Sequence, residues 1–326
     1  MNRRAFVTGL GAVLAAPLAL EAQQPGKVYR IGYLAHISDS SMPRLMEAFR
    51  ESLASSGWIE GQNITIEYRS AEGNAERLPE LARDLVRVGV DVIVALVPGA
   101  VLAATKATSA IPIVMVHGPD PVQLHLVGSL ARPGGNITGL TTLSADLSAK
   151  QFELLKALVP SLTRIAVLSN PTNPWHPLAL DGIEERAKSI GVVVHSVPTR
   201  NVDQLESSFA AIVRGRAGGV HVLADPMTVF ARERIAKLAL THRLPAMGST
   251  RETAEAGCLS CYWPNSADMN RRAATYVDRI LRGSPPGQLP IEQPTKYDFL
   301  INLKTAKALG LTIPSSLLLR ADQIIE

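Results

Sequence analysis

Cysteine and aromatic residues are scarce in this chain, which has two cysteines among 326 residues and only 5% Phe, Trp and Tyr. Cys258 and Cys261 have the C-x-x-C spacing that occurs in redox and zinc sites. The segment around them is apolar and aromatic, which is typical of a strand, and residues three apart on a strand point to opposite faces. A second pair of zinc ligands is missing. We therefore expect two packed thiols, and the sequence alone leaves a disulfide between them open.

Long apolar runs and clustered charge are missing as well. No run reaches the roughly 20 apolar residues that a membrane-spanning helix needs. The formal net charge of +4 is small, and the basic residues are scattered along the chain. We therefore expect neither a membrane span nor a nucleic-acid-binding surface.

Motifs of catalysis and of metal binding are also lacking. The chain contains no G-x-S-x-G, and no P-loop or G-x-G-x-x-G follows a predicted strand. Its 7 histidines show no metal-ligand spacing. We expect no enzyme activity, no cofactor and no metal site.

The first 22 residues have the pattern of a signal peptide. Arg3 and Arg4 precede an apolar stretch that ends near Leu20, and Ala22 provides a small residue for cleavage. The stretch is too short to cross a membrane, and its flanks suit export. The arginine pair followed by Ala-Phe-Val resembles a twin-arginine signal, and a Sec signal that contains two arginines stays open. Either signal predicts a mature chain in the periplasm.

The stretch from Val90 to Val122 predicts how the rest of the chain is organised. A β-branched strand reaches Val97, Pro98 and Gly99 are expected to end it, a helix is predicted over 100–108, and a second strand over 111–116. Such a strand, helix, strand unit requires parallel strands. Its two loops, at 98–99 and 117–121, then lie at the carboxyl edge of the sheet, where open α/β sheets bind ligands.

The same alternation continues through two consecutive halves of the chain. Further strands are predicted at 29–35, 63–69, 137–142, 164–170, 192–197, 219–224, 244–248, 258–263 and 299–302, and further helices at 43–55, 75–88, 149–159, 177–190, 202–214, 228–242 and 266–281. This pattern predicts two doubly wound α/β lobes with parallel sheets. The third segment is expected to return to the first lobe and to cross again. We assign 28–140 and 265–290 to the N-terminal lobe, and 141–264 and 291–326 to the C-terminal lobe, joined by a multi-strand hinge.

Three blocks of sequence resemble a known family. They are 57–63 (GWIEGQN), 131–139 (ARPGGNITG) and 302–310 (NLKTAKALG). In this order they resemble the substrate-binding proteins of ABC transporters, and among these the tryptophan- and tyrosine-type proteins. The resemblance covers nearly all of the mature chain. It implies a type I periplasmic-binding-protein fold, capture of a small solute such as an aromatic amino acid, and an ABC transporter permease in the inner membrane as partner. We expect a monomer.

The chain differs from this family in two places. It has Val97-Pro98-Gly99-Ala100 where relatives usually have Gly-Thr after the third strand, which removes a hydroxyl that could bind a carboxylate. It also differs at 257–263, where GCLSCYW replaces a glycine-rich pattern. The identity of the solute therefore stays open.

Polar residues at the predicted carboxyl edges are the candidates for ligand binding. Serine hydroxyls and the helix start at Gly99 suit a carboxylate, whereas Asp225 or Glu252 suits an ammonium group, and Trp175 suits a ring or a cation. Ser, Asn and Asp at strand ends are also common turn formers and helix caps; we favour Asp225 over Asp120 for direct contact. The full set is Ser38, Ser40, Ser41, Gly99, Asp120, Asn170, Asn173, Trp175, Asp225, Ser249 and Glu252.

These observations predict the periplasmic substrate-binding component of an ABC importer. Two alternatives stay open, namely an exported ligand sensor for a signalling partner and a periplasmic enzyme built on the same fold. A cytoplasmic sensor or repressor domain with this fold is a further rival, which the export signal argues against and which cell fractionation would test. Turnover of a bound ligand would reveal an enzyme.

Overall fold

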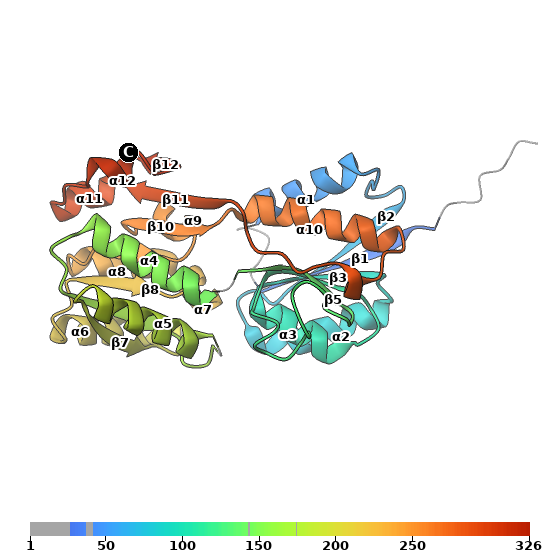
Figure 1. Cartoon of the computed structure of the whole chain (residues 1–326), viewed down its shortest axis with the longest axis horizontal. Coiled ribbons are helices and arrows are strands. Elements are labelled where there is room, and N and C mark those ends of the chain that lie inside the picture. The colour runs from blue at the N-terminus through green and yellow to red at the C-terminus, as the bar shows by residue number, and fades with distance from the viewer. Residues whose placement is uncertain (1–26, 37–41, 143, 174) are drawn as a thin grey trace, which may run out of the picture.

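The computed structural model describes residues 27–36, 42–142, 144–173 and 175–326. These residues form two α/β lobes that lie side by side (Figure 1). The predicted signal peptide, 1–22, lies outside the described residues. No helix in the described ranges is long and apolar enough to cross a membrane.

The first lobe contains a five-stranded parallel sheet. Its strands have the order β2-β1-β3-β4-β5. They are β1 (Tyr29–Ala35), β2 (Ile64–Ser70), β3 (Val92–Leu96), β4 (Ile113–Gly118) and β5 (Ile137–Thr141). The strand order changes direction between β1 and β3, so the loops that follow these two strands diverge at the carboxyl edge and leave room for a ligand.

Alternation along the strands places two helical layers on this sheet. Ile31 and Tyr33 pack with α1 (Pro43–Ser55) and α10 (Ser266–Leu281). Leu34, the residue after Tyr33, packs with α2 (Leu78–Val88) and α3 (Val97–Ala107) on the other face. Successive side chains of a strand point to opposite faces, so a strand buried on both faces has the near-continuous apolar sequence seen here. A short 3-10 turn, Ala75–Arg77, precedes α2.

The second lobe contains a seven-stranded sheet with the order β12-β11-β10-β9-β8-β6-β7. Its strands are β6 (Arg164–Ser169), β7 (Val193–Pro198), β8 (Gly219–Val222), β9 (Ala246–Gly248), β10 (Ser260–Pro264), β11 (Tyr297–Asn302) and β12 (Gln323–Ile325). Only the pair of β10 and β11 is antiparallel among the described strand pairs of this sheet. This is the consequence of the chain leaving the lobe after β10 and re-entering it from the opposite direction.

Helices cover both faces of the second sheet. One layer contains α4 (Ser144–Leu158) and α5 (His176–Ser189), whose Phe152 and Ile183 pack against Val167 of β6. The other contains α6 (Leu205–Arg214) and α8 (Arg232–Thr241), whose Phe209 and Ile235 pack in a second core. The remaining helices are α7 (Pro226–Phe230), α9 (Arg251–Glu255), α11 (Leu303–Leu309) and α12 (Ser315–Leu318), with 3-10 turns at Val202–Gln204 and Pro286–Gln288.

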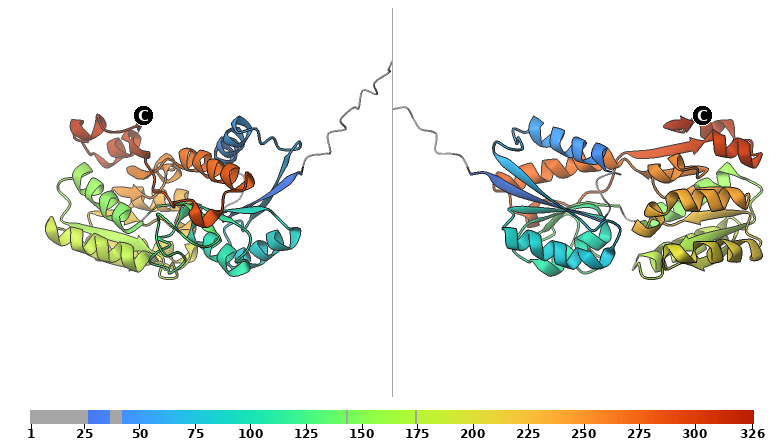
Figure 2. Two further views of the ribbon diagram at one scale, coloured as in Figure 1. Left: turned by 45° about the vertical axis from the view of Figure 1, so that its right-hand side comes forward. Right: turned by 180° about the vertical axis from the view of Figure 1, so that it is seen from behind.

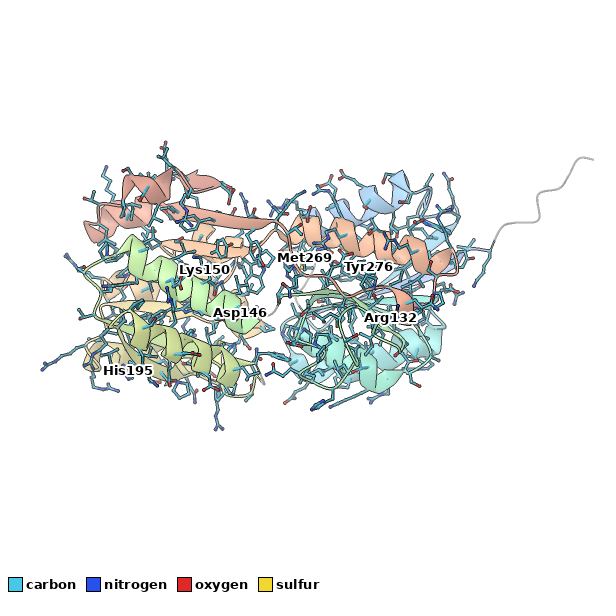
Figure 3. The ribbon with its side chains drawn as sticks, viewed as in Figure 1. Arg132, Asp146, Lys150, His195, Met269 and Tyr276 are labelled. Atoms are coloured by element: carbon cyan, nitrogen blue, oxygen red, sulfur yellow. The ribbon has the colours of Figure 1, made fainter. Side chains whose placement is uncertain are left out.

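Helix α10 follows a strand of the second lobe but packs in the first lobe, where it lies beside α1 (Figures 1 and 2). Two polar contacts hold it there. Tyr33 donates to Asn270 Oδ1 over 2.7 Å in the buried interior, and the half-buried Trp58 donates to Asp278 Oδ1 over 2.8 Å. Tyr276, which is labelled with Met269 on this helix in Figure 3, donates to the carbonyl of Pro290. The chain therefore passes between the lobes after β5, after β10 and before β11.

Several predicted elements were wrong in their bounds. The helix predicted over 149–159, for example, is α4 and begins at Ser144. Pro98 and Gly99 do not end the third strand in a loop; they belong to the first turn of α3, which begins at Val97. Proline suits that position because its fixed φ is helical and its missing N–H has no partner there. The helix predicted over 228–242 is two helices. Asp225 caps the first, which starts at Pro226 and ends at Phe230, and the second starts at Arg232. The sequence also gave no indication of α9, α12 and β12.

Candidate functional site

A cavity of about 150 Å³ lies between the lobes, at the carboxyl edges of both sheets. The first lobe contributes residues that follow or end β1, β3 and β4, namely His36, Val97 and His117. The second lobe contributes Asp225 after β8 and Trp263 at the end of β10. A more open hollow of about 450 Å³ shares His36 and Asp225 with this cavity. Ligands of open α/β sheets bind at this edge, and here the edges of two sheets supply one cavity.

Most of the cavity wall is apolar. The first lobe supplies Met42, Leu45, Leu96 and Pro98. The second lobe supplies three aliphatic side chains and two indole rings, those of Ala179, Leu223, Val229, Trp175 and Trp263. A wall of this kind favours a solute with a substantial apolar part, because burying apolar surface contributes about 25 cal/mol per Å².

Asp225 is the centre of a hydrogen-bond network on the second lobe. Its Oδ1 accepts from the backbone N–H of Met227 over 2.8 Å and from Asn170 Nδ2 over 3.2 Å. Its Oδ2 accepts from Asn173 Nδ2 over 2.9 Å. The side chain is only 6% exposed. Asp225 therefore caps α7 and also holds the loop after β6 against the residue that follows β8.

Two histidines lie near this carboxylate. His176 accepts from the backbone N–H of Asn170 at Nδ1, and its Nε2 lies 3.1 Å from the carbonyl of Ala224, so the proton is on Nε2. Burial lowers the pKa of His176, and the two hydrogen bonds and the charge of Asp225 oppose that shift. Burial likewise lowers the pKa of His36, which faces Asp225 from the first lobe, while the carboxylate opposes the shift. Both imidazoles are therefore biased towards the neutral form.

Several buried polar atoms at the cavity have no hydrogen-bond partner among the described residues. On residues that line the cavity, these atoms are the two ring nitrogens of His117, Nε1 of Trp175 and Oγ1 of Thr250. Oγ of Ser249, the neighbour of Thr250, is a further one. A buried polar group without a partner costs about 1–3 kcal/mol. These unpaired atoms come from both lobes and gather at one cavity. A polar ligand in the cavity would supply their missing hydrogen bonds. His195, which is also without a partner at Nδ1, lies on β7, far from the other lobe (Figure 3).

The cavity also contains charged side chains of both signs. Arg232, at the start of α8, donates to the carbonyl of Val229 over 3.1 Å. Glu252, in α9, is half-buried. Neither forms an ion pair with another described residue. An unpaired cation and an unpaired anion at one cavity suit a ligand that carries both charges.

The structure brings most of the predicted site residues together. Asn173, Trp175, Asp225 and Glu252 line the cavity, and Gly99 and Asn170 line the adjoining hollow, together with Asn173 and Asp225. Ser249 precedes Thr250 of the cavity wall and is fully buried. Ser38, Ser40 and Ser41 lie outside the described residues.

Asp120 lies apart from this group. Its Oδ1 accepts from the backbone N–H groups of Val122 and Gln123 and so closes a turn. It lines neither of the two hollows. Its role here is the one that Asp commonly has at a strand end.

The cavity residues that the sequence candidates did not include are numerous, and among them are His36, His117, Arg232 and Trp263. The two histidines had a usable signal, because each follows or ends a predicted strand at the carboxyl edge. Trp263 ends a predicted strand too. Arg232 had none, since it was expected in the interior of one long helix.

The two cysteines are free and buried, which confirms the prediction of packed thiols. Cys258 packs in the core beneath α6 and α8, whereas Cys261 belongs to a separate cluster with Leu300. The two thiols therefore lie in separate clusters of the core. Burial raises the pKa of both thiols, that of Cys258 to about 12.

Two α/β lobes with a cavity between their carboxyl edges define a two-lobed solute-binding protein with the type I periplasmic-binding-protein fold. The chain belongs to the ABC transporter substrate binding protein family, whose model matches residues 30–325. Members of this family bind small solutes and work with an ABC transporter.

Relatives and solved structures agree with this assignment. A tyrosine-binding protein of Clostridioides difficile is 27% identical over 286 residues, which are 87% of this chain and 82% of the relative. A conserved domain protein of Vibrio cholerae has a structure with a TM-score of 0.85 and 27% identity, covering 91% of this chain and 100% of that one. An ABC domain of Streptococcus pneumonia, solved in complex with L-Trp, has a TM-score of 0.84 and 24% identity, covering 91% and 99%.

Proposed function

We propose that this protein is the periplasmic substrate-binding component of an ABC importer and that its solute is an aromatic amino acid. The observation that carries the proposal is the combination of groups at one cavity. An unpaired guanidinium, that of Arg232, an unpaired carboxylate, that of Glu252, and a mostly apolar, aromatic wall all line the space between the lobes.

Each part of an amino acid has a counterpart in this cavity. The guanidinium of Arg232 suits the α-carboxylate, because a planar fork of N–H donors matches two carboxylate oxygens. Glu252 suits the α-ammonium group, and Asp225 adds negative charge although its oxygens already accept three hydrogen bonds. Trp175 and Trp263 suit an aromatic side chain, since stacked or edge-on ring pairs contribute about 0.5–1.5 kcal/mol beyond area burial.

Closure of the lobes is the proposed mode of action. Both lobes line the cavity, so a solute that touches both stabilises only the closed arrangement. We assign 28–140 and 265–290 to one moving lobe and 141–264 and 291–326 to the other, with the three connections as the hinge. No covalent step is proposed, and none of the groups is given a catalytic role.

The setting of this function is proposed from the sequence and the family. An export signal over 1–22, of the twin-arginine or the Sec type, would deliver the mature chain to the periplasm. There the closed monomer would present its solute to a permease in the inner membrane. The 27% identical relative named as a tyrosine-binding protein supports the class of solute.

A thermal-shift screen followed by calorimetry tests the proposal. The mature chain is screened against L-Trp, L-Tyr, L-Phe, aliphatic amino acids, aromatic acids without an amino group, sugars and small peptides. Solute at 100 times its dissociation constant adds about 2.7 kcal/mol of stability. We expect a response to aromatic amino acids that is lost when either the carboxylate or the amino group is removed. A response confined to sugars or to peptides would overturn the proposal.

A further inference from the structure

His117 is an unusual residue at the end of β4. Its φ is 52°, in the left-handed region that favours glycine, and the register of β4 with β5 shifts beside it, between Met115 and Gly118. A non-glycine residue held in that region costs about 1–3 kcal/mol, and such residues concentrate at ligand sites. The strained backbone sets His117 at the wall of the cavity between the lobes.

The imidazole of His117 is buried without a hydrogen bond. The residue is 7% exposed, and neither ring nitrogen has a partner among the described residues. Buried polar groups in folded proteins are nearly always paired, so an exception calls for an explanation. Here the explanation must lie in something that enters the cavity.

Trp263 holds this ring from the second lobe. The two ring centroids are 5.7 Å apart and the rings are inclined by 28°, which is a stacked arrangement. Trp263 is at the end of β10, next to the connection that leads to α10. The stacked pair therefore forms an aromatic wall with a neutral hydrogen-bonding edge, and it is made by both lobes together.

Burial lowers the pKa of His117 to about 4. The imidazole is therefore neutral at physiological pH, with one nitrogen that donates and one that accepts. A neutral ring cannot compete with Arg232 for the carboxylate of a solute. It is suited to an uncharged group such as a hydroxyl or a ring N–H.

We propose that His117 selects among aromatic solutes by a hydrogen bond to a hydroxyl or N–H group on the ring, so that phenol and indole side chains are bound in preference to a plain benzene ring. This rests on the proposed function, since it assigns the side-chain end of the same site. A site that is built to hydrogen-bond a polar group rejects the analogue that lacks it, because its own polar atoms are then left unpaired. His117 is in this sense a specificity-determining residue.

Matched pairs of ligands test the selection by isothermal titration calorimetry. L-Tyr is compared with L-Phe, and L-Trp with its isostere β-(3-benzothienyl)-L-alanine, which lacks the N–H. We expect the wild type to prefer the polar member of at least one pair by tenfold or more. A wild type that distinguishes neither pair would overturn the proposal.

Two variants test whether the preference for the polar ligand depends on His117. His117→Phe keeps a flat ring for stacking on Trp263 but has no ring nitrogen, so the preference should fall to about onefold while the affinity for the apolar member is kept. His117→Asn tolerates a positive φ and keeps a donor and an acceptor, so part of the preference should remain. If a folded His117 variant kept the full preference of the wild type for the polar ligand, another residue would be responsible for that preference.

Failure of the proposed function has a separate signature. If no amino acid binds the wild type, the solute class is wrong, and His117 is then tested with p-cresol and toluene as probes of the aromatic wall alone. A preference for p-cresol that depends on His117 supports its role without the amino-acid site. Equal binding of the two probes, or no binding of either, overturns it.

Discussion

Asn173 donates a hydrogen bond from Nδ2 to Oδ2 of Asp225 over 2.9 Å, and this contact joins the loop after β6 to the residue that caps α7. Both residues line the cavity between the lobes. Both oxygens of the Asp225 carboxylate therefore accept hydrogen bonds within the protein. These bonds fix the orientation of the carboxylate before a solute binds.

Replacement of Asp225 by alanine tests this arrangement. We expect Asp225→Ala to weaken binding of the solute tenfold or more, on the order of 1.4 kcal/mol, and to lower stability by about 1 kcal/mol through loss of the helix cap. Calorimetry and thermal unfolding measure the two effects. Asp120→Ala is the matched control, because Asp120 closes a turn away from both hollows. Equal affinities in the two variants would remove Asp225 from the site.

Arg232 is expected to provide the main positive charge for the solute. In Arg232→Gln the dissociation constant should rise at least tenfold, with little change in stability, because its one described hydrogen bond is to the carbonyl of Val229. Arg234→Gln on the same helix is the control, since Arg234 is exposed and pairs with Glu206. If both variants bind the solute as the wild type does, another group must bind its carboxylate.

Gly139 of β5 cannot be replaced without strain. Its φ is 113°, and a Cβ there would lie 2.5 Å from the backbone N and O of Met115. We expect Gly139→Ala to lower the free energy of unfolding by about 2–4 kcal/mol. Gly135→Ala is the control, because Gly135 has open space at its Cβ position, and we expect a change within about 0.5 kcal/mol. Urea unfolding of the two variants would refute the prediction if their stabilities matched.

Stability should fall as the pH is lowered through the range of histidine titration. Burial lowers the pKa of His117 to about 4 and that of His221 to about 3. The unfolded chain therefore binds more protons than the folded chain between these values and the ordinary pKa of about 6.5, so stability rises with pH across this window. For His117 the difference amounts to about 3 kcal/mol. Urea unfolding at several pH values measures the slope.

His117→Phe separates the two contributions to this pH dependence. In this variant, stability should depend less steeply on pH above about pH 4, because the contribution of His117 is gone. The contribution of His221 should remain. A slope identical to that of the wild type would mean that His117 is not buried neutral.

The cysteines should be unreactive in the folded protein. Both thiols are buried, and burial raises the pKa of each, so little thiolate is present to attack a reagent. We expect an aromatic disulfide reagent to label neither thiol until guanidinium chloride is added, and both afterwards. Rapid labelling of either cysteine in the native chain would contradict the burial of that thiol.

Much of the fold was accessible from the sequence because it depends on neighbours along the chain. The bounds of β1, α1 and α10 were predicted as they are observed, since apolar periodicity, Pro43 at a helix start and the residues that end each element are local signals. Alternation of strands and helices then indicated two α/β lobes, and the family blocks indicated how they are combined. The start of α3 was missed because a proline and a glycine after a strand suit a loop as well as a first helical turn.

The candidate site was predictable only in part. Asn173, Asp225 and Glu252 line the cavity, and the sequence pointed to them because they follow strands at a carboxyl edge, which is a local property. The stacking of His117 on Trp263 depends on a chain that passes between the lobes three times and on a bulge that turns one residue into the left-handed region. Arg232 reaches the cavity because the helix predicted there is broken before it.

The sequence by itself thus determined most of the elements, their alternation into two lobes and the family to which the chain belongs. Which side chains meet in the cavity was decided only by the tertiary structure. The physical reason is that helices and strands form from interactions over a few residues, whereas the cavity forms between strand ends and helix starts that are brought together by the packing of both lobes. The charged and aromatic groups that would recognise a solute come from such separate elements, and their proximity has no signature in the order of the residues.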